Sequence, residues 1–312
     1  MLSKINLRNK LFSFPLIREI LFFVFRKKMY KKIVNKKILL LFKGEKKLNG
    51  IKLDKLIVSL TSFPERIAEI KYAIFSLLDQ TILPGKIILW LAESQFPNKE
   101  KDLPEELLIF KKFGLVINWC EDLRSYKKLV PTLKKFPNHY MVTADDDLYY
   151  KKKWLEKLWF EHLKYPNDVI CHLAARVSFM NKDILSYVKW ERYIKKECVG
   201  YNVFGCSGGG ILFHKDFLYE DVVNTDLFLN LAPYADDIWF YFMTIMNGTM
   251  IRVVRNPYTR VKYINPYREY GLKNGYKLAT INVDSNFNDR QIKNIIDHYQ
   301  VDLFSLLNKK FA

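Results

Sequence analysis

From residue 55 onward, short apolar runs alternate with stretches of helical periodicity, and this alternation constrains the fold more than any other feature. The apolar runs predict strands at residues 56–60, 86–91, 115–119, 140–144 and 169–173. Apolar residues at helical spacing lie between them, at residues 67–78, 104–113, 126–135 and 154–163. Strands that alternate with helices are typical of a mainly parallel sheet with helices on both faces. We therefore expect an α/β fold.

The second half of the chain is less regular. A glycine cluster covers residues 205–210, a helical stretch covers 235–246, and a last apolar run covers 251–254. Because the sequence has no internal repeat and no linker, residues 51–312 are expected to form one compact domain behind an extension of residues 1–50. Ligands of parallel sheets bind beyond the carboxyl ends of the strands, so the segments after the predicted strands deserve inspection.

Two common nucleotide-binding motifs are missing from the sequence. The turn after the first predicted strand reads Ser-Phe-Pro-Glu-Arg at residues 62–66, which is neither GxGxxG nor a P-loop. The three glycines at 208–210 come late and lack a following Lys-Ser/Thr pair. Hydride transfer and P-loop phosphate chemistry are therefore excluded as functions.

Three consecutive aspartates, Asp145, Asp146 and Asp147, directly follow the predicted strand at 140–144. Adjacent carboxylates repel each other, and their apolar neighbours limit their hydration. A divalent cation removes this penalty, and hard oxygen ligands suit Mn²⁺ or Mg²⁺, which usually bridge carboxylates to substrate phosphates. The alternative is a solvated acidic turn, but such turns usually have Gly, Ser or Asn neighbours. We interpret the triplet as a metal site.

The order of these segments resembles that of bacterial GT-A-fold glycosyltransferases, of the family-2-like type that builds surface polysaccharides. The resemblance covers about residues 55–300 and rests on the segments VSLTSFPERI, SLLDQTILPGKIILWLAESQFP, SYKKLVPTL, VTADDDLYY and YADDIWF. It implies a GT-A (Rossmann-like) fold and sugar transfer from a nucleotide sugar, with a UDP-sugar favoured. The acceptor it implies is a glycan or a lipid-linked sugar.

Carried over to this sequence, the resemblance implies that Asp145 and Asp147, with Asp146 beside them, hold the metal on the donor diphosphate. Thr61 and Arg66 are expected near the nucleotide, although Arg66 can equally be a surface cation on its helix.

Two adjacent lysines precede the metal strand. Lys127 and Lys128 lie where a cation can reach a phosphate, and a solvated helix start is an equally good interpretation of either one.

A second acidic pair, Asp236-Asp237, opens the helix at 235–246. The resemblance implies that a carboxylate here is the general base of an inverting transfer. Asp237 is preferred over Asp236 for this role, since one of the two aspartates is expected to cap the helix. Acidic residues at a helix start are also favoured by the helix dipole without any catalytic role. Tyr234 and Trp239 are candidates for a surface on which a sugar stacks.

Two further features have open roles. The glycine cluster at 205–210 fits either a loop that lines a sugar pocket or a tight structural turn. His214 and His298 are candidates for a third metal ligand, but neither lies in a motif that assigns it.

Positive charge is concentrated in the extension. Residues 1–50 contain fourteen Lys/Arg and two acidic residues, whereas the whole chain has a net charge of +18. Aromatic and aliphatic residues at 11–25 precede seven of these cations, which lie at residues 26–37, and such a segment can lie on an anionic membrane surface. The alternative is that this segment packs on the domain. We expect a cytoplasmic protein, peripheral on the inner face of the cell membrane.

The leading hypothesis from the sequence is a metal-dependent, inverting glycosyltransferase. A nucleotidyltransferase or metal nuclease is the alternative, because carboxylates in a basic protein also suit nucleic acid. No nucleic acid is expected as partner, since the charge lies before the domain rather than around its motifs. A non-catalytic membrane adaptor with the same fold is a third hypothesis.

Overall fold

The computed structural model describes residues 15–265 and 286–307 of the chain. The chain divides into two compact units, each of which is described by itself. Helix α2 (Pro15–Phe42) belongs to the first unit. Residues 48–262 belong to the second unit, together with the C-terminal helices α11 (Phe287–Tyr299) and α12 (Leu303–Leu307).

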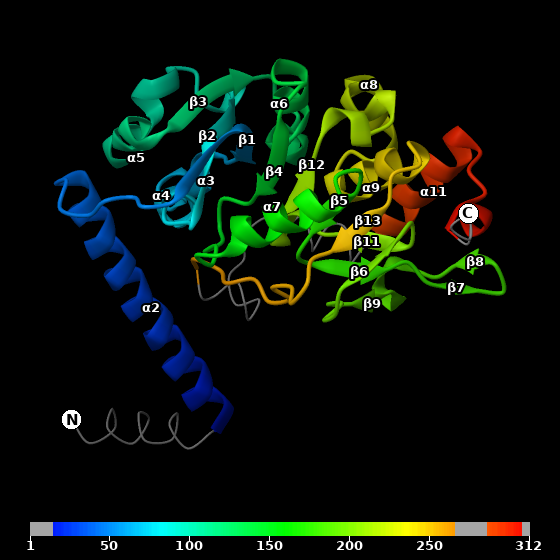
Figure 1. The fold of residues 1–312 in the computed structure, drawn as a ribbon, viewed down its shortest axis with the longest axis horizontal. Helices are drawn as coiled ribbons and strands as arrows, with labels where there is room; N and C mark the ends of the chain where they lie inside the picture. The colour runs from blue at the N-terminus through cyan, green and yellow to red at the C-terminus, as the bar shows by residue number, and fades with distance from the viewer. Residues whose placement is uncertain (1–14, 266–285, 308–312) are drawn as a thin grey trace, which may run out of the picture. The chain divides into compact units, whose positions relative to one another are not determined.

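Eight strands form the central sheet of the second unit, in the order β10-β13-β5-β12-β4-β1-β2-β3 (Figure 1). Their bounds are β1 Ile51–Thr61, β2 Ile82–Ala92, β3 Leu115–Cys120, β4 Tyr140–Ala144, β5 Val169–Cys171, β10 Cys198–Gly200, β12 Ile211–Phe213 and β13 Ile251–Val253. The four strands from β3 to β4 are parallel, as are β5 and β13. Strand β12 is antiparallel to both neighbours, and β10 is antiparallel to β13. The expected α/β class with a mostly parallel sheet is confirmed.

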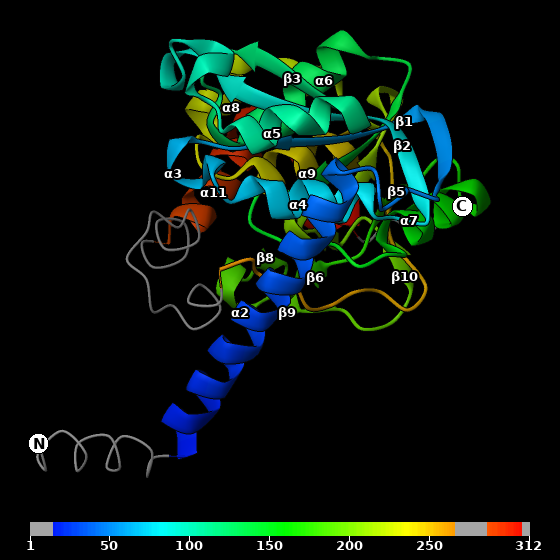
Figure 2. The ribbon, with the colours of Figure 1, turned by 90° about the vertical axis from the view of Figure 1, so that its left-hand side faces the viewer.

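Helices cover both faces of the sheet (Figure 2). On one face, a hydrogen bond of 2.7 Å joins the hydroxyls of Ser59 in β1 and Thr132 in α6. On the other, the Leu155 amide of α7 donates to Oε1 of Gln80, just after α4. The helices are α3 Pro64–Ile67, α4 Ile70–Leu78, α5 Glu105–Ile109, α6 Val130–Lys135, α7 Trp154–Lys164, α8 Thr225–Leu231 and α9 Asp236–Met246.

Two small sheets lie beyond the central one. The first has the order β11-β6-β9, and the second pairs β7 with β8. Their bounds are β6 Ala174–Arg176, β7 Phe179–Met180, β8 Asp183–Ile184, β9 Glu191–Arg192 and β11 Val203–Gly205. These short strands fill the part of the chain in which the sequence shows no regular alternation.

Strand β2 differs from its prediction, because it includes Pro84 and Gly85, which the sequence suggested as a turn. The β1–β2 register shifts between Leu53 and Ile57, and a Cβ at Gly85 would lie 2.5 Å from the carbonyl oxygen of Asp54. A proline is tolerated in a strand at such an irregularity, and only glycine permits this close backbone approach. The strand therefore continues through residues that usually end one.

The helix expected at 126–135 is broken into two pieces. A 3₁₀ turn, η4 (Arg124–Lys128), is followed by Leu129 with φ −130°, and α6 begins at Val130. Pro131 lies in the first turn of α6, where its missing N–H leaves no bond unmade. The break fixes the orientation of Lys127 and Lys128 at the end of η4.

Helix α2 has apolar side chains both buried and exposed. Val34, Ile38 and Leu41 are buried, whereas Phe25 is 60% exposed and Met29 is also exposed. None of the helices in the described ranges, α2 included, has an apolar segment long enough to cross a membrane.

Candidate active site

The aspartate triplet meets the end of the first strand. Strands β1 and β4 are parallel neighbours with Leu60 opposite Ala144, so the residues after both strands lie at one edge of the sheet. The Ser62 hydroxyl donates to Oδ2 of Asp146 at 2.6 Å, and Nη1 of Arg66 lies 2.7 Å from the other carboxylate oxygen. Asp146 is only 5% exposed and has both oxygens engaged. It therefore ties the β1 loop to the triplet.

Arg66 forms ion pairs with two carboxylates of the triplet. Its Nη1 also lies 3.4 Å from Oδ2 of Asp147. Although burial opposes the charge, Asp146 and Asp147 raise the pKa of the Arg66 guanidinium. Arg66 is therefore part of the carboxylate cluster and not a solvated surface cation.

Lys128 joins the triplet to the second acidic pair. Its Nζ lies 3.0 Å from Oδ1 of Asp145, 2.9 Å from Oγ of Ser207 and 3.2 Å from Oδ2 of Asp236. Burial favours the neutral amine, but Asp145, Asp236 and Asp237 together raise the pKa of Lys128 well above its usual value. A buried ammonium thus holds together carboxylates from two distant parts of the sequence. We refer to Arg66, Lys128, the triplet, Asp236 and Asp237 as the carboxylate cluster.

Neither aspartate at the start of α9 caps the helix, contrary to the sequence-based expectation. The N-cap is Ala235, which has no side-chain capping bond. Asp236 turns to Lys128, and Oδ1 of Asp237 accepts a hydrogen bond of 3.2 Å from the Ser207 amide. The partners within the cluster, rather than the helix end, orient both carboxylates.

Asp237 is the carboxylate with the most perturbed acidity in this cluster. Burial, followed by the negative charge of Asp236, raises the pKa of Asp237 to about 7, although Lys128 and the Ser207 side chain oppose the shift. A general base is most effective when its pKa lies near the working pH. Asp237 therefore has the acidity that proton abstraction near neutral pH needs.

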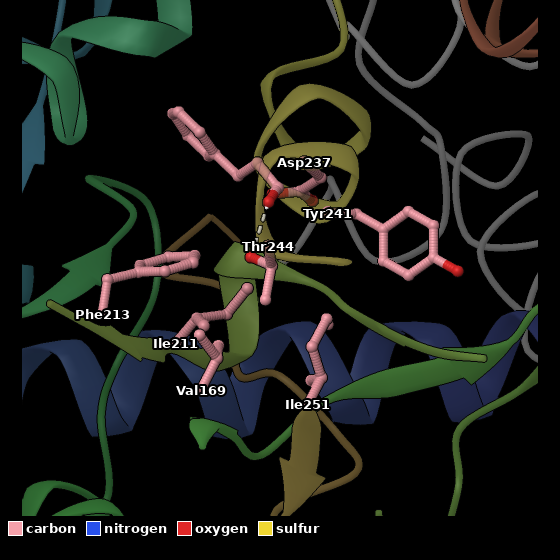
Figure 3. A pocket seen from close by; sticks show the side chains of 9 residues that line it. Val169, Ile211, Phe213, Asp237, Tyr241, Thr244 and Ile251 are labelled. Atoms are coloured by element: carbon pink, nitrogen blue, oxygen red, sulfur yellow. Dashed lines mark hydrogen bonds between the residues drawn. The ribbon is translucent and has the colours of Figure 1, made fainter. Parts of the chain in front are cut away.

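Apolar side chains surround a small pocket beside Asp237, under α9, and these side chains account for the desolvation of its carboxylate (Figure 3). Besides Asp237, the pocket is lined by Val169, Gly205, Ile211, Phe213, Phe240, Tyr241, Thr244 and Ile251. These walls are almost entirely apolar, and the cavity volume of about 10 Å³ is far below the range of about 300–1,000 Å³ typical of ligand pockets. The pocket thus shapes the environment of Asp237 and is too small for a sugar nucleotide.

Two of the predicted site residues bond outside the cluster. The Thr61 hydroxyl donates to the Trp90 carbonyl at 2.8 Å, so this side chain faces strand β2. Lys127 donates to Oδ1 of Asp122 at 2.5 Å. Although burial opposes it, Lys127 lowers the pKa of Asp122. The structure therefore brings Arg66 and Lys128 to the triplet and leaves Thr61 and Lys127 outside it.

The glycine cluster divides into structural and site-facing positions. A Cβ at Gly209 or Gly210 would lie 2.3 Å from Leu173 or from the Trp154 ring, and Gly210 has φ +94°. A Cβ at Gly208 would lie 3.0 Å from Oδ2 of Asp145. Gly209 and Gly210 are thus required by packing, and Gly208 leaves room beside the triplet.

Sequence reasoning missed three polar residues of the site. Ser62 and Ser207 contact the cluster directly, and the Tyr150 hydroxyl accepts a hydrogen bond of 2.7 Å from the Asp145 amide. Only the alternation of side chains along a strand could have indicated Ser62. Neighbouring residues of a strand face opposite sides of the sheet, so Thr61 and Ser62 are expected to point in opposite directions. Ser207 lies in the glycine cluster, where the sequence drew attention to the glycines.

The proposed stacking role of Trp239 is wrong. Trp239 is fully buried and donates its ring N–H to the Val222 carbonyl, so no sugar can reach it. Tyr234 lies under the Arg124 guanidinium, 4.2 Å from its ring centroid.

The two histidine candidates contact aromatic rings. His214 lies 4.9 Å from the ring of Tyr140, at the amino end of β4 and thus at the opposite end of this strand from the triplet. His298 lies against Tyr299 in α11. His214 is therefore wrong as a third ligand of a metal at the triplet.

The donor set of the triplet suits a hard divalent cation in part. Asp145 is paired with a cation through Oδ1, and its Oδ2 faces the space beside Gly208. Asp147 lies beside it with 15% of its side chain exposed. Mg²⁺ is usually held by one or two carboxylates, with water and substrate phosphates completing its shell. Among residues 15–265 and 286–307, no group of three or more His, Cys, Asp or Glu is placed to hold a metal ion.

Comparison with known proteins returned no similar family or sequence: no protein-family model matches the chain, and no curated protein matches it significantly.

Proposed function

We propose that the protein is a metal-dependent, inverting glycosyltransferase that moves a sugar from a nucleotide sugar to a glycan or a lipid-linked acceptor. The observation that carries this proposal is the meeting of the triplet and the Asp236-Asp237 pair around the single ammonium of Lys128. A glycosyl transfer needs a place for the diphosphate and a base for the acceptor hydroxyl. The carboxylate cluster offers candidates for both within one site.

The mostly parallel sheet is compatible with the GT-A fold, to which we assign residues 51–312. The triplet follows β4 and Arg66 follows β1, so both lie beyond the carboxyl ends of parallel strands. This edge is where ligands of such sheets bind. A UDP-sugar is the donor that we favour.

In the proposed reaction, Asp237 removes the proton of the acceptor hydroxyl. The acceptor oxygen then forms a bond to the anomeric carbon as the bond from that carbon to the diphosphate oxygen breaks. The nucleoside diphosphate leaves on the opposite side, so one displacement inverts the anomeric configuration. The raised pKa of Asp237 supports this role because the carboxylate is a stronger base than a solvated aspartate.

Asp145 and Asp147 would hold the Mn²⁺ or Mg²⁺ ion. Such an ion, when bound, neutralises the charge of the departing diphosphate. Asp146 has a structural role instead, because its contacts with Ser62 and Arg66 fix the loop after β1 beside the two metal ligands. Arg66 and Lys128 orient the carboxylates through ion pairs before the donor arrives.

We further propose that residues 1–50 hold the enzyme on the inner face of the cell membrane. In α2, Phe25, Met29 and Ile33 recur every four residues and are exposed. Lys28 and Lys32 are exposed at the same spacing. Residues four apart share one side of a helix, so an apolar stripe lies beside a basic one. Such a surface suits anionic headgroups above acyl chains.

The proposal is tested by a screen of UDP-, GDP-, CMP- and dTDP-sugars for nucleotide release with Mn²⁺, Mg²⁺ or EDTA. We expect one donor class to be consumed only when a metal is present, with an inverted product by NMR. A wild-type protein that consumes no donor with any acceptor fraction would refute the proposal. Release of nucleotides from DNA or RNA instead would favour a nuclease.

The membrane assignment has its own test. Deletion of residues 1–50 should abolish sedimentation with phosphatidylglycerol vesicles at low salt while the catalytic domain stays folded. Equal sedimentation of the two proteins would refute the assignment without affecting the proposed reaction.

A further inference from the structure

Helix α7 buries one side and exposes the other. The buried side carries Trp154, Leu155, Leu158, Glu161 and His162. The other side is the outer face of α7, which we define by Lys153, Lys157, Phe160, Leu163 and Lys164. Each of these residues is three or four positions from another of them, and residues so spaced are neighbours on a helix surface. Lys157 is half-buried and the other four are exposed.

Two large apolar side chains lie among the lysines of this outer face. Phe160 is 51% exposed and Leu163 is 57% exposed. Because they are three residues apart, they form one apolar patch on the helix surface. Apolar side chains beside a row of lysines are typical of helices that lie in the interface of a membrane.

The segment after β13, residues 254–262, runs beside α7 (Figure 1). The Arg255 amide donates to Oε2 of Glu161 at 3.5 Å, and Nζ of Lys157 donates to the Asn256 carbonyl at 2.6 Å. This segment contains no acidic residue, and the side chain of Arg255 is exposed. It therefore adds positive charge next to the outer face of α7.

Tyr258 of the same segment is surrounded by cations. Nζ of Lys151 and Nζ of Lys157 lie 4.3 Å and 4.6 Å from its ring centroid. Its ring stacks on His172 at 4.9 Å, and its amide donates to Nδ1 of this histidine. We refer to the surface around Tyr258, formed by Lys151, Lys157 and Arg260, as the basic surface. It is continuous with the outer face of α7, because Lys157 belongs to both.

Carboxylates neutralise little of this positive charge. Glu156, which lies 3.6 Å from Nζ of Lys153, is half-buried. Glu161, the other acidic residue of α7, is buried. In the described part of the chain, Lys164 and Arg255 form no ion pair. The charge of this region is therefore complementary to an anionic partner.

We propose that the outer face of α7 and the basic surface together dock on a membrane of anionic phospholipids. Phe160 and Leu163 enter the boundary between headgroups and acyl chains, and the surrounding lysines and arginines contact the headgroup phosphates. The apolar patch favours a membrane over nucleic acid, because binding to a phosphate backbone is electrostatic and needs no apolar contact.

This surface is a second membrane contact, beside the one proposed for residues 1–50. Two weak contacts on one chain bind more tightly than either alone, because the second forms at a high effective concentration. By itself the surface is expected to hold the protein too weakly for sedimentation, since stable membrane binding usually takes two signals. The inference thus rests on the membrane assignment and is independent of sugar transfer.

The test is partition of the full chain onto phosphatidylcholine vesicles with and without phosphatidylglycerol, measured by sedimentation over a range of salt concentrations. The double variant Lys153→Gln/Lys164→Gln should weaken partition roughly tenfold at low salt and flatten its salt dependence. The double variant Phe160→Ser/Leu163→Ser should weaken it roughly fivefold. All four side chains are exposed, so both variants should fold, which circular dichroism checks.

Two further variants serve as controls. Lys101→Gln/Lys112→Gln removes the same charge from exposed positions in η2 (Lys99–Asp102) and η3 (Phe110–Phe113), and it should change partition less than about twofold. Glu156→Gln should act in the opposite direction and strengthen partition about two- to fivefold, because it removes a carboxylate next to the outer face. A purely structural role of α7 would not produce this gain.

The outcomes separate this surface from the extension. If both double variants partitioned as wild type does while deletion of residues 1–50 abolished binding, the inference would be overturned and the extension upheld. Wild-type protein that does not bind phosphatidylglycerol vesicles would refute both membrane contacts and leave the proposed sugar transfer unaffected. Normal vesicle binding together with weakened RNA binding in the Lys153→Gln/Lys164→Gln variant would also overturn the inference, and would assign the surface to nucleic acid.

Discussion

The carboxylate cluster differs in its treatment of charge from the basic surface around Tyr258, which is formed by Lys151, Lys157 and Arg260. In the cluster, Arg66 and Lys128 each contact two carboxylates. On the basic surface, Lys151 and Arg260 have no such partner among the described residues. Charges that are paired and buried hold a structure together, whereas like charges left side by side favour binding of a counter-ion. The cluster is thus preorganised, whereas the basic surface leaves its charges available to a counter-ion.

The largest effect is expected from removing the cation at the centre of the cluster. Lys128→Met leaves Asp145 and Asp236 without their ammonium, and breaking a buried ion pair from one side costs about 3–5 kcal/mol. Urea denaturation measures this loss of unfolding free energy. Lys134→Gln, an exposed change on α6, should cost less than about 0.5 kcal/mol. A loss below about 1 kcal/mol in Lys128→Met would show that the cluster is not held by this lysine.

The next effect separates the two acidic groups within the cluster. Asp237→Asn should lower the rate of sugar transfer by about 10²–10⁴, because a general base contributes a factor of this size. Donor binding should change little, since the triplet is intact. Asp236→Asn is the matched variant, and a larger fall in transfer rate there with normal turnover in Asp237→Asn would reassign the base.

The pH dependence of stability tests the environment of Asp237. The pKa of Asp237 is raised from 3.8 to about 7 in the folded protein, so its contribution to stability is lost as the pH rises from about 4 to about 7. Asp237→Asn abolishes this loss. The stability of the variant relative to wild type should therefore increase over this range, by up to about 1.4 kcal/mol per pH unit, and stay constant above it. Parallel stability curves for the two proteins would contradict the raised pKa.

The smallest effect is expected on the basic surface. Lys151→Gln removes a charge that has no carboxylate partner in the described structure, so the free energy of unfolding should change by less than about 0.5 kcal/mol. The pKa of Lys157 should rise, because Lys151 is one of the charges that lowers it; NMR titration measures this. A destabilisation comparable with that of Lys128→Met would remove the distinction between the two regions.

Much of the fold could be predicted from the sequence, because its elements follow local patterns. Strand β4 has the predicted bounds of residues 140–144, since an apolar run ends there at three charges. Pro84 and Gly85 misled the prediction, because a bulge between β1 and β2 accepts residues that usually form a turn. The local sequence of one strand does not reveal an irregularity in its pairing with another strand.

The site was predictable in its residue types but not in their orientations. The choice between Thr61 and Ser62, or between Lys127 and Lys128, depends on where a strand or helix ends, and neighbouring residues point in different directions. Trp239 was misplaced for the same reason, because an aromatic residue at a helix start can face the core or the solvent. The basic surface was missed altogether, since its cations come from segments about 110 residues apart in the sequence.

The central claim is tested most directly by measuring donor binding and transfer side by side in three proteins with Mn²⁺. Wild type should bind a nucleotide sugar and transfer the sugar, Asp147→Asn should lose metal-dependent binding and transfer, and Asp237→Asn should bind the donor without transferring its sugar. Lack of nucleotide-sugar binding by wild type, or full transfer by Asp147→Asn, would contradict the account.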